Sequence, residues 1–147
     1  MKNYPCFNEK VAVITGASSG IGKALAQQLA ASGANLALVD INQTGLDDTV
    51  ATLANSDHVT TYVLDVSDRT AYQNFVKQVI ADHGQVDIVI NNAGIIRLHS
   101  IEDGSYFDYE KTMDINFWGV LYGCKEFIPY LKQSPEAWLV NVSSADG

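Results

Sequence analysis

The segment Thr15–Ala24, TGASSGIGKA, combines three glycines and two serines with a lysine, and it directly follows the apolar, β-branched run VAVIT. Glycines let a backbone turn sharply and approach a ligand closely, and the N–H groups that open a helix attract anions. The segment therefore predicts a loop that binds phosphate. The candidates are a nucleoside triphosphate, a dinucleotide, or no ligand at all, in which case the loop is a plain tight turn.

The spacing argues against a nucleoside triphosphate. The P-loop pattern G-x-x-x-x-G-K-[ST] ends on a hydroxyl that binds Mg²⁺. In this chain five residues separate Gly16 from Gly22, and Ala24 follows Lys23. Both the glycine spacing and the metal-binding hydroxyl therefore fail to match.

A dinucleotide fits better, although the usual G-x-G-x-x-G spacing is replaced by G-x-x-x-G-x-G. Gly16 can turn the chain at the end of a strand, Gly20 can let backbone approach a pyrophosphate, and Gly22 can let a helix pack close to the sheet. The N–H groups of Ser19–Ile21 would then open that helix and face the anion, aided by the helix dipole.

An acidic residue supports this interpretation. In dinucleotide-binding folds a carboxylate about 20 positions beyond the glycine loop holds the ribose hydroxyls of adenosine. Asp40 ends the apolar run NLALVD, 18 residues after Gly22. The alternative is that Asp40 caps the next helix, a role that Asn42 or Thr44 could also take.

The elements that must position these residues alternate along the chain. Short runs rich in β-branched residues predict five strands, at Val11–Thr15, Asn35–Asp40, Val59–Asp65, Val86–Asn91 and Trp138–Val142. Apolar residues at helical spacing lie between them, and the longest such pattern runs from about Phe107 to Leu131. We expect an α/β protein with a parallel sheet, right-handed crossovers and helices on both faces.

Composition excludes several other classes of protein. The chain has 147 residues, 47% hydrophobic and 18% charged, with a formal net charge of −8, which predicts one globular domain. The sequence has no cluster of basic residues, so a nucleic-acid partner is not expected. It has no apolar run long enough to span a membrane, and its first residues lack the apolar region of a signal peptide. We therefore expect a cytoplasmic protein. Cys6, Cys124 and the three histidines lack metal-ligand spacing, so no metal site is expected.

Five motifs, in order and over the whole chain, resemble those of the short-chain dehydrogenases/reductases. The resemblance implies an α/β, Rossmann-type, doubly wound parallel sheet of strand order 3-2-1-4-5. TGASSGIG (15–22) resembles the cofactor loop of that family, and NNAG (91–94) resembles the motif that ends the fourth strand and supports the cofactor. Asp65 followed by Val66 resembles the pair that holds the adenine ring. Together with Asp40, the resemblance implies cofactor contacts by Gly16, Ser18, Ser19, Gly20, Ile21, Gly22, Asp65, Val66, Asn92, Ala93 and Gly94.

The two remaining motifs carry the reaction in that family. Asn116, in MDINFWG, resembles the helix asparagine of the catalytic tetrad, and Ser144, in NVSSADG, resembles the catalytic serine. The resemblance implies hydride transfer between a nicotinamide cofactor and an alcohol or carbonyl substrate. Ser144 would hydrogen-bond the substrate oxygen, and Asn116, expected to lie in an otherwise buried helix, would hold a water molecule.

The family's Tyr-x-x-x-Lys pair has no counterpart, because no tyrosine of the sequence has a lysine four residues later. We therefore expect residues 1–147 to be the NAD-binding Rossmann domain of such an enzyme, with its sheet truncated after the fifth strand and inactive by itself. The alternative is a non-catalytic dinucleotide-binding or interaction module.

Two further expectations concern the ligands and partners of the chain. Asp40 would repel the 2′-phosphate of NADP, so NAD is the expected cofactor. The resemblance implies self-association through the long helix from about Phe107 to Leu131, which predicts a homo-oligomer. The segment Ile95–Tyr106 is expected to form one wall of the pocket for a small alcohol or carbonyl compound.

Overall fold

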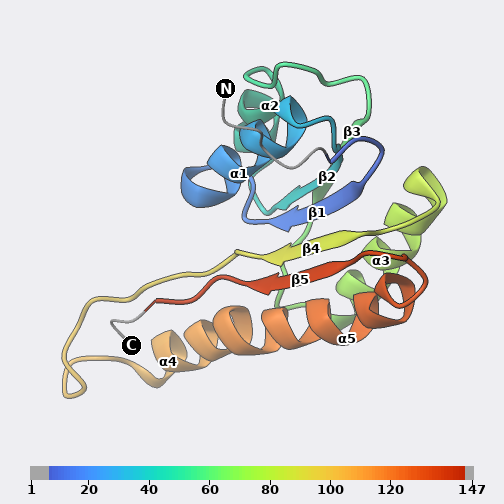
Figure 1. The fold of residues 1–147 in the computed structure, drawn as a ribbon. Coiled ribbons are helices and arrows are strands. Elements are labelled where there is room, and N and C mark those ends of the chain that lie inside the picture. Colours follow the sequence, from blue (N-terminus) through green and yellow to red (C-terminus); the bar gives the residue numbers. More distant parts are fainter. Residues whose placement is uncertain (1–6, 145–147) are drawn as a thin grey trace.

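A computed structural model describes residues 7–144, which form a five-stranded parallel sheet with helices on both faces (Figure 1). The strands are β1 (Val11–Thr15), β2 (Asn35–Asp40), β3 (Val59–Val63), β4 (Ile88–Asn91) and β5 (Trp138–Asn141). Their order across the sheet is β3-β2-β1-β4-β5. The predicted fold class and strand order are therefore confirmed.

The helices divide between the two faces of the sheet. They are α1 (Gly20–Ala31), α2 (Gln43–Val50), α3 (Arg69–His83), α4 (Tyr106–Met113) and α5 (Val120–Leu131), with a π-helical turn η1 (Asp114–Gly119) joining the last two. In Figure 1, α1 and α2 lie above the sheet and α5 lies below it. The core contacts of α3 place it on the same face as α5.

The alternation of side chains along each strand builds two separate cores, because successive residues of a strand point to opposite faces. On one face, Val11 and Val13 of β1 pack with aromatic residues of α3 and α5, among them Phe75 and Phe127. On the other face, Ala12 and Ile14 pack with the small and branched residues of α1 and α2. All five residues of β1 are buried, and the first four, Val11 to Ile14, are accordingly apolar.

Three predicted strand ends and one predicted helix differ from the structure. β3 ends at Val63 rather than Asp65, β4 begins at Ile88 rather than Val86, and β5 ends at Asn141 rather than Val142. Hydrophobic sequence continues past these points, but the paired register between neighbouring strands does not. A single backbone hydrogen bond lies beyond each end, from Leu64 to Asp40, from Asp87 to Val11 and from Val142 to Asn91. The long helical pattern is interrupted by η1, and π-helical turns frequently mark functional sites.

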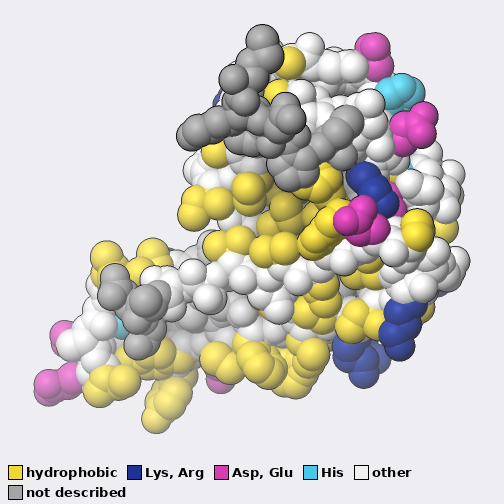
Figure 2. Space-filling view, in the orientation of Figure 1, with side chains coloured by type: hydrophobic (Ala, Val, Ile, Leu, Met, Phe, Trp, Pro, Cys, Tyr) yellow, Lys and Arg dark blue, Asp and Glu magenta, His cyan; other side chains and the backbone are white. Residues whose placement is uncertain are grey.

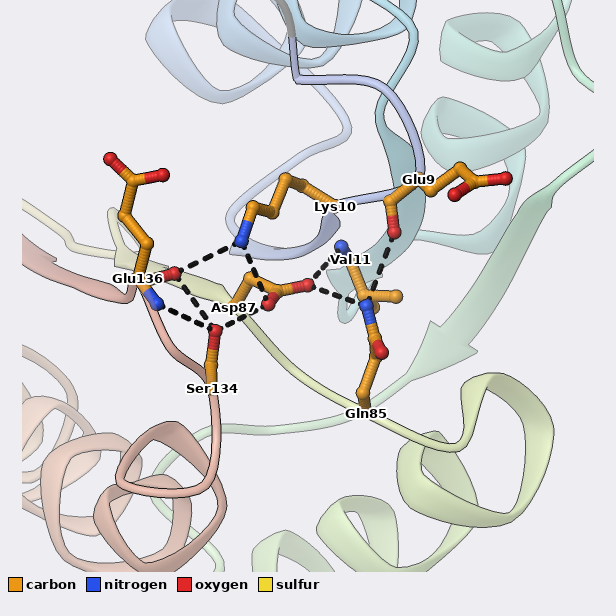
Figure 3. Close-up of polar contacts among 7 residues, drawn as sticks. All are labelled: Glu9, Lys10, Val11, Gln85, Asp87, Ser134 and Glu136. Atoms are coloured by element: carbon orange, nitrogen blue, oxygen red, sulfur yellow. Dashed lines mark hydrogen bonds and ion pairs between the residues drawn. The ribbon is translucent and has the colours of Figure 1, made fainter.

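A cluster of polar side chains connects the segments that precede or begin the strands, at the N-terminal edge of the sheet (Figure 3). The carboxylate of Asp87 accepts hydrogen bonds from the backbone N–H of Val11 at 2.9 Å, from Gln85 at 2.9 Å and from the hydroxyl of Ser134 at 2.6 Å. Lys10 adds an ion pair at 3.4 Å. The side chain of one residue thus connects β1, β4 and the loop that leads into β5.

The surface carries an apolar stripe along α4, η1 and α5. Figure 2 shows hydrophobic side chains gathered along the lower side of the molecule, where Figure 1 places these helices. The exposed side chains of this stripe are Tyr106, Phe107, Met113, Phe117, Trp118 and Ile128. Within residues 7–144, no helix has the length and hydropathy needed to cross a membrane, and no three potential metal ligands gather in one place. Cys124 carries a free thiol, and Cys6 lies outside the described residues.

Candidate functional site

A cavity of about 420 Å³ opens at the carboxyl ends of β1, β2, β3 and β4. Its size lies within the range typical of small-molecule sites, and its place is where open α/β sheets bind ligands. Every predicted cofactor-binding residue except Gly22 lines it. The structure therefore brings together residues that lie as far apart in the sequence as Gly16 and Gly94.

The glycine loop is held in a shape that larger residues could not adopt. Gly16 has a φ of +68°, and a Cβ on it would lie 2.9 Å from the Cα of Ala93. Gly22 is buried, and a Cβ on it would collide with the carbonyl oxygen of Gly16. Gly22 thus sets the contact between α1 and the loop from beneath the cavity floor, which explains why it does not line the cavity.

The start of α1 offers free donors to the cavity. The first N–H groups of a helix have no partner within the helix. Among the helices that follow a loop in residues 7–144, α2, α3 and α4 have side-chain caps from Asn42, Asp68 and Ser105 respectively, but the cap position of α1, Ser19, makes no such bond. Gly20 has open space where its Cβ would be. Uncapped donors beside an open approach suit a phosphate group.

Thr15 and Asn92 tie the glycine loop to the end of β4. The buried Thr15 hydroxyl accepts hydrogen bonds from the backbone N–H groups of Asn92 and Ala93, both at 3.0 Å. The side-chain amide of Asn92 donates to the carbonyl oxygens of Thr15 at 3.0 Å and Gly16 at 3.2 Å. Asn92 therefore lines the cavity and at the same time supports the loop. Thr15 opens the glycine motif, but no separate role was expected for its side chain.

Asp40, at the end of β2, faces the same loop. Its carboxylate accepts the backbone N–H of Ser18 at 3.1 Å and that of Asn42 at 3.0 Å. The alternative role of Asp40 as a helix cap is excluded, because the side chain of Asn42 caps α2 by accepting the N–H of Gly45. A carboxylate has about four acceptor positions, so Asp40 keeps acceptors for hydroxyl groups in the cavity.

Asp65 follows β3, and its carboxylate is already well supplied with partners. It accepts the backbone N–H of Ser67 at 2.9 Å and the Ser67 hydroxyl at 2.5 Å, and it pairs with Lys111 of α4 at 3.1 Å. Burial acts to raise the pKa of Asp65, but the hydrogen bonds from Ser67 and the charge of Lys111 outweigh it and hold the pKa below its usual value. Lys111 also lines the cavity, and no motif in the sequence pointed to it.

Asn116 lies in the π-helical turn and reaches the loop after β4. Its carbonyl oxygen accepts the backbone N–H of Ile95 at 2.9 Å, and its amide donates to the carbonyl oxygen of Ile95 at 2.8 Å. Asn116 is exposed, so the expectation of a buried helix was wrong: within η1 the buried residue is Gly119. Its amide nevertheless has both partners, and Gly94 packs beside it.

The other predicted catalytic residue, Ser144, lies just beyond β5 and is exposed. It does not line the cavity at the ends of β1 to β4. Residues 145–147 of its motif fall outside the described residues.

The residues present fit a dinucleotide on three counts. The cavity holds uncapped helix donors for a pyrophosphate, a carboxylate with spare acceptors for ribose hydroxyls, and the apolar side chains of Ile21, Ile41 and Val66 for a flat ring. The glycines are placed where a side chain would block the loop or its packing. This arrangement can bind and orient a cofactor.

Comparisons with known proteins point to the same class. The family model described as short chain dehydrogenase matches residues 10–147. SadH of Mycobacterium tuberculosis, a proposed oxidoreductase, is 42% identical over 142 residues, which cover 96% of this chain and 51% of SadH. The chain thus spans about half the length of this curated relative.

Two solved structures share the fold. A short chain dehydrogenase/reductase from Burkholderia phymatum in complex with NAD is 34% identical with a TM-score of 0.89, covering 96% of this chain and 51% of that one. A 3-ketoacyl-(acyl-carrier-protein) reductase from Brucella melitensis complexed with NADH is 29% identical with a TM-score of 0.88, covering 94% and 58% respectively. The family match over residues 10–147, on a sheet of the order expected from the sequence, shows that the chain belongs to the short-chain dehydrogenase family of oxidoreductases.

Proposed function

We propose that this chain is the NAD-binding part of an oxidoreductase that moves a hydride between NAD and a small alcohol or carbonyl compound. One observation carries the proposal: the uncapped start of α1 and the carboxylate of Asp40 face a single cavity at the ends of the strands. Structures of similar proteins were solved with NAD and with NADH, which supports a nicotinamide cofactor here.

Each part of the cavity has its own role in this proposal. The N–H groups of Ser19–Ile21 bind the pyrophosphate, and Asp40 accepts the adenosine ribose hydroxyls. Asp65 and Val66 hold the adenine ring beyond the ribose. Asn92, Ala93 and Gly94 keep the loop and the end of β4 in place. The bound nicotinamide supplies the hydride chemistry, and the chain supplies binding and orientation.

The proposed preference for NAD over NADP rests on charge. NADP carries a phosphate on the ribose hydroxyl that Asp40 would otherwise accept. Like unit charges about 4 Å apart repel by about 4 kcal/mol at an effective dielectric constant near 20. No basic residue among those lining the cavity near Asp40 offsets this, because the neighbours there are Ser18, Ser19 and Ile41.

Catalysis needs groups that these 147 residues lack. The family resemblance assigns a substrate hydrogen bond to Ser144 and a water contact to Asn116, and it assigns proton transfer to a Tyr-x-x-x-Lys pair that the sequence does not contain. Proton transfer by a positioned side chain contributes roughly 10²–10⁴-fold to a rate. We therefore propose that the chain binds NAD but does not turn it over by itself.

A second candidate is a non-catalytic dinucleotide-binding or interaction module. It shares the binding site and differs in having no reaction in any context. Both candidates need the same cavity, so turnover, and not cofactor binding, separates them.

Calorimetric titration of the 147-residue chain with NAD, combined with assays of NADH formation over a panel of secondary alcohols, tests the proposal. We expect weak, saturable NAD binding and no turnover. Adding a carboxyl-terminal half that contains Tyr-x-x-x-Lys, from a related enzyme, separates the two candidates, since only the oxidoreductase part gains turnover. A chain that does not bind NAD, or that turns it over unaided, would contradict the proposal.

A further inference from the structure

One wall of the cavity contains an ion pair between elements that are distant in sequence. Lys111, in the last turn of α4, places its Nζ atom 3.1 Å from Oδ2 of Asp65 and 3.2 Å from the hydroxyl oxygen of Ser67. Lys111 and Asp65 both line the cavity, and their side chains are 32% and 35% exposed respectively. Lys111 is the one basic residue among those lining the cavity.

The acceptor positions of Asp65 are almost all in use. A carboxylate has about four of them, two on each oxygen. Oδ1 accepts both the N–H and the hydroxyl of Ser67, and Oδ2 accepts from Lys111. One position therefore remains, and it is on the oxygen that Lys111 holds.

The place of Asp65 in the sheet decides which part of a dinucleotide it meets. The pyrophosphate belongs at α1, which follows β1, and the adenosine ribose belongs at Asp40, which ends β2. Asp65 follows β3, the next strand outward in the same direction. The adenine ring, which extends beyond its ribose, therefore reaches Asp65. Adenine presents a hydrogen-bond donor there, the 6-amino group.

The helix that carries Lys111 is fixed against the same loop at a second point. Gly119, buried in η1, lies so close to Val66 that a Cβ on it would be 2.9 Å from a methyl group of Val66. Two contacts, one at Lys111 and one at Gly119, hold the helix and the loop 64–67 in one relative position. The backbone that carries Lys111 is therefore held in place relative to Asp65.

From this geometry we propose that Lys111 is a positioning residue for the adenine ring: it fixes the carboxylate of Asp65 so that the last acceptor position on Oδ2 meets the 6-amino group. The inference rests on the proposed function and adds to it a residue that neither the sequence motifs nor the family resemblance marks. Without the lysine, the carboxylate is held through Oδ1 only, and Oδ2 is free to turn toward water.

The test compares NAD with nicotinamide purine dinucleotide, the analogue with hydrogen in place of the 6-amino group. A hydrogen bond to a charged group is strong enough for the unmodified chain to bind NAD about tenfold more tightly than the analogue. In Lys111→Met and Lys111→Gln we expect this preference to fall to about threefold or less. Lys111→Arg keeps a cation at the site and should retain most of the preference for NAD over the analogue. Lys77→Met, an exposed lysine of α3 outside the cavity, removes the same charge and should keep the full preference.

The ratio of the two affinities is the decisive measurement, because a general loss of charge or stability weakens both ligands equally. Circular dichroism of each variant checks the fold, and the two neutral variants differ in polarity, so either one can carry the test. If the unmodified chain binds NAD and the preference is unchanged in the neutral variants, this inference is wrong while the proposed function stands. If the unmodified chain does not bind NAD, both are wrong.

Discussion

Asp87, which directly precedes β4, accepts the backbone N–H of Val11, the first residue of β1, at 2.9 Å. The same carboxylate also receives the hydroxyl of Ser134 from the loop before β5 (Figure 3). Its side chain is 3% exposed. Removing one partner of a buried, hydrogen-bonded charge strongly destabilises the folded state, because the remaining group is left buried without compensation. The junction of the three strands therefore depends on one ionised group.

Asp87→Asn should lower the free energy of unfolding at pH 7 by about 2–4 kcal/mol, because the amide cannot accept from all of these donors and loses the charge that pairs with Lys10. Chemical denaturation measures the difference. Asp48→Asn, an exposed residue of α2, is the matched control and should change stability by less than about 0.5 kcal/mol. Equal effects of the two substitutions would contradict the role of Asp87.

The same group makes a pH-dependent prediction. Burial acts to raise the pKa of Asp87, but hydrogen bonds from Ser134 and Val11 and the charge of Lys10 hold it below its usual value. A lowered pKa in the folded state stabilises the protein above the pKa of the unfolded state, about 3.9, and this stabilisation is lost as the pH falls through the lowered value. The stability difference between the unmodified chain and Asp87→Asn should thus be constant above about pH 5 and shrink below about pH 4. A stability difference between the two proteins that grows as the pH falls would contradict this prediction.

Gly22→Ala should damage the cofactor loop. The added methyl group would collide with the carbonyl oxygen of Gly16 and lie 2.8 Å from the amide nitrogen of Asn92. We expect a loss of about 1–3 kcal/mol in stability and about tenfold or more in NAD affinity. Gly84→Ala is the control: Gly84 has a φ of +75° at the end of α3 with open space around it, so stability falls by about 1 kcal/mol without a change in NAD affinity. Normal NAD binding by Gly22→Ala would count against the loop as the phosphate site.

Asp40→Asn tests the preference between the two cofactors. The amide keeps the shape of the side chain and removes the charge that would repel the 2′-phosphate of NADP. We expect the unmodified chain to prefer NAD, and this preference to shrink by about tenfold or more in the variant. Titration with both cofactors gives the ratio, with Asp48→Asn again as the control for net charge. Tighter binding of NADP by the unmodified chain would be incompatible with the proposal.

We also propose that the chain self-associates through the apolar stripe on α4, η1 and α5. Phe107 and Phe117 are 68% and 49% exposed, and a stripe of this kind favours pairing with a second copy. Sedimentation should show a dimer or larger species, and Phe107→Glu should shift it toward the monomer, whereas Lys77→Glu on α3 should not. A clean monomer of the unmodified chain would rule this out.

The sequence determined the architecture of this protein to a large extent. The apolar runs predicted β1 and β2 to the residue, because the central residues of both strands are buried and polar residues stand only at the strand ends. The glycine motif likewise predicted a tight loop between β1 and α1, since the positive φ of Gly16 and the tight packing of Gly22 each require a residue without a side chain. These features are local, and local sequence is sufficient to encode them.

Tertiary structure decided the rest, because it depends on partners that are distant in sequence. The ends of β3 and β5 are set by where the neighbouring strand stops, and not by where hydrophobic residues stop. The pairing of Lys111 with Asp65 joins residues 46 positions apart, and the local sequence around either residue does not predict the pairing. The bidentate contact of Asn116 with Ile95 likewise exists only because a helix crosses the loop after β4. Folding, by bringing the ends of parallel strands to one edge, turned scattered polar residues into a site.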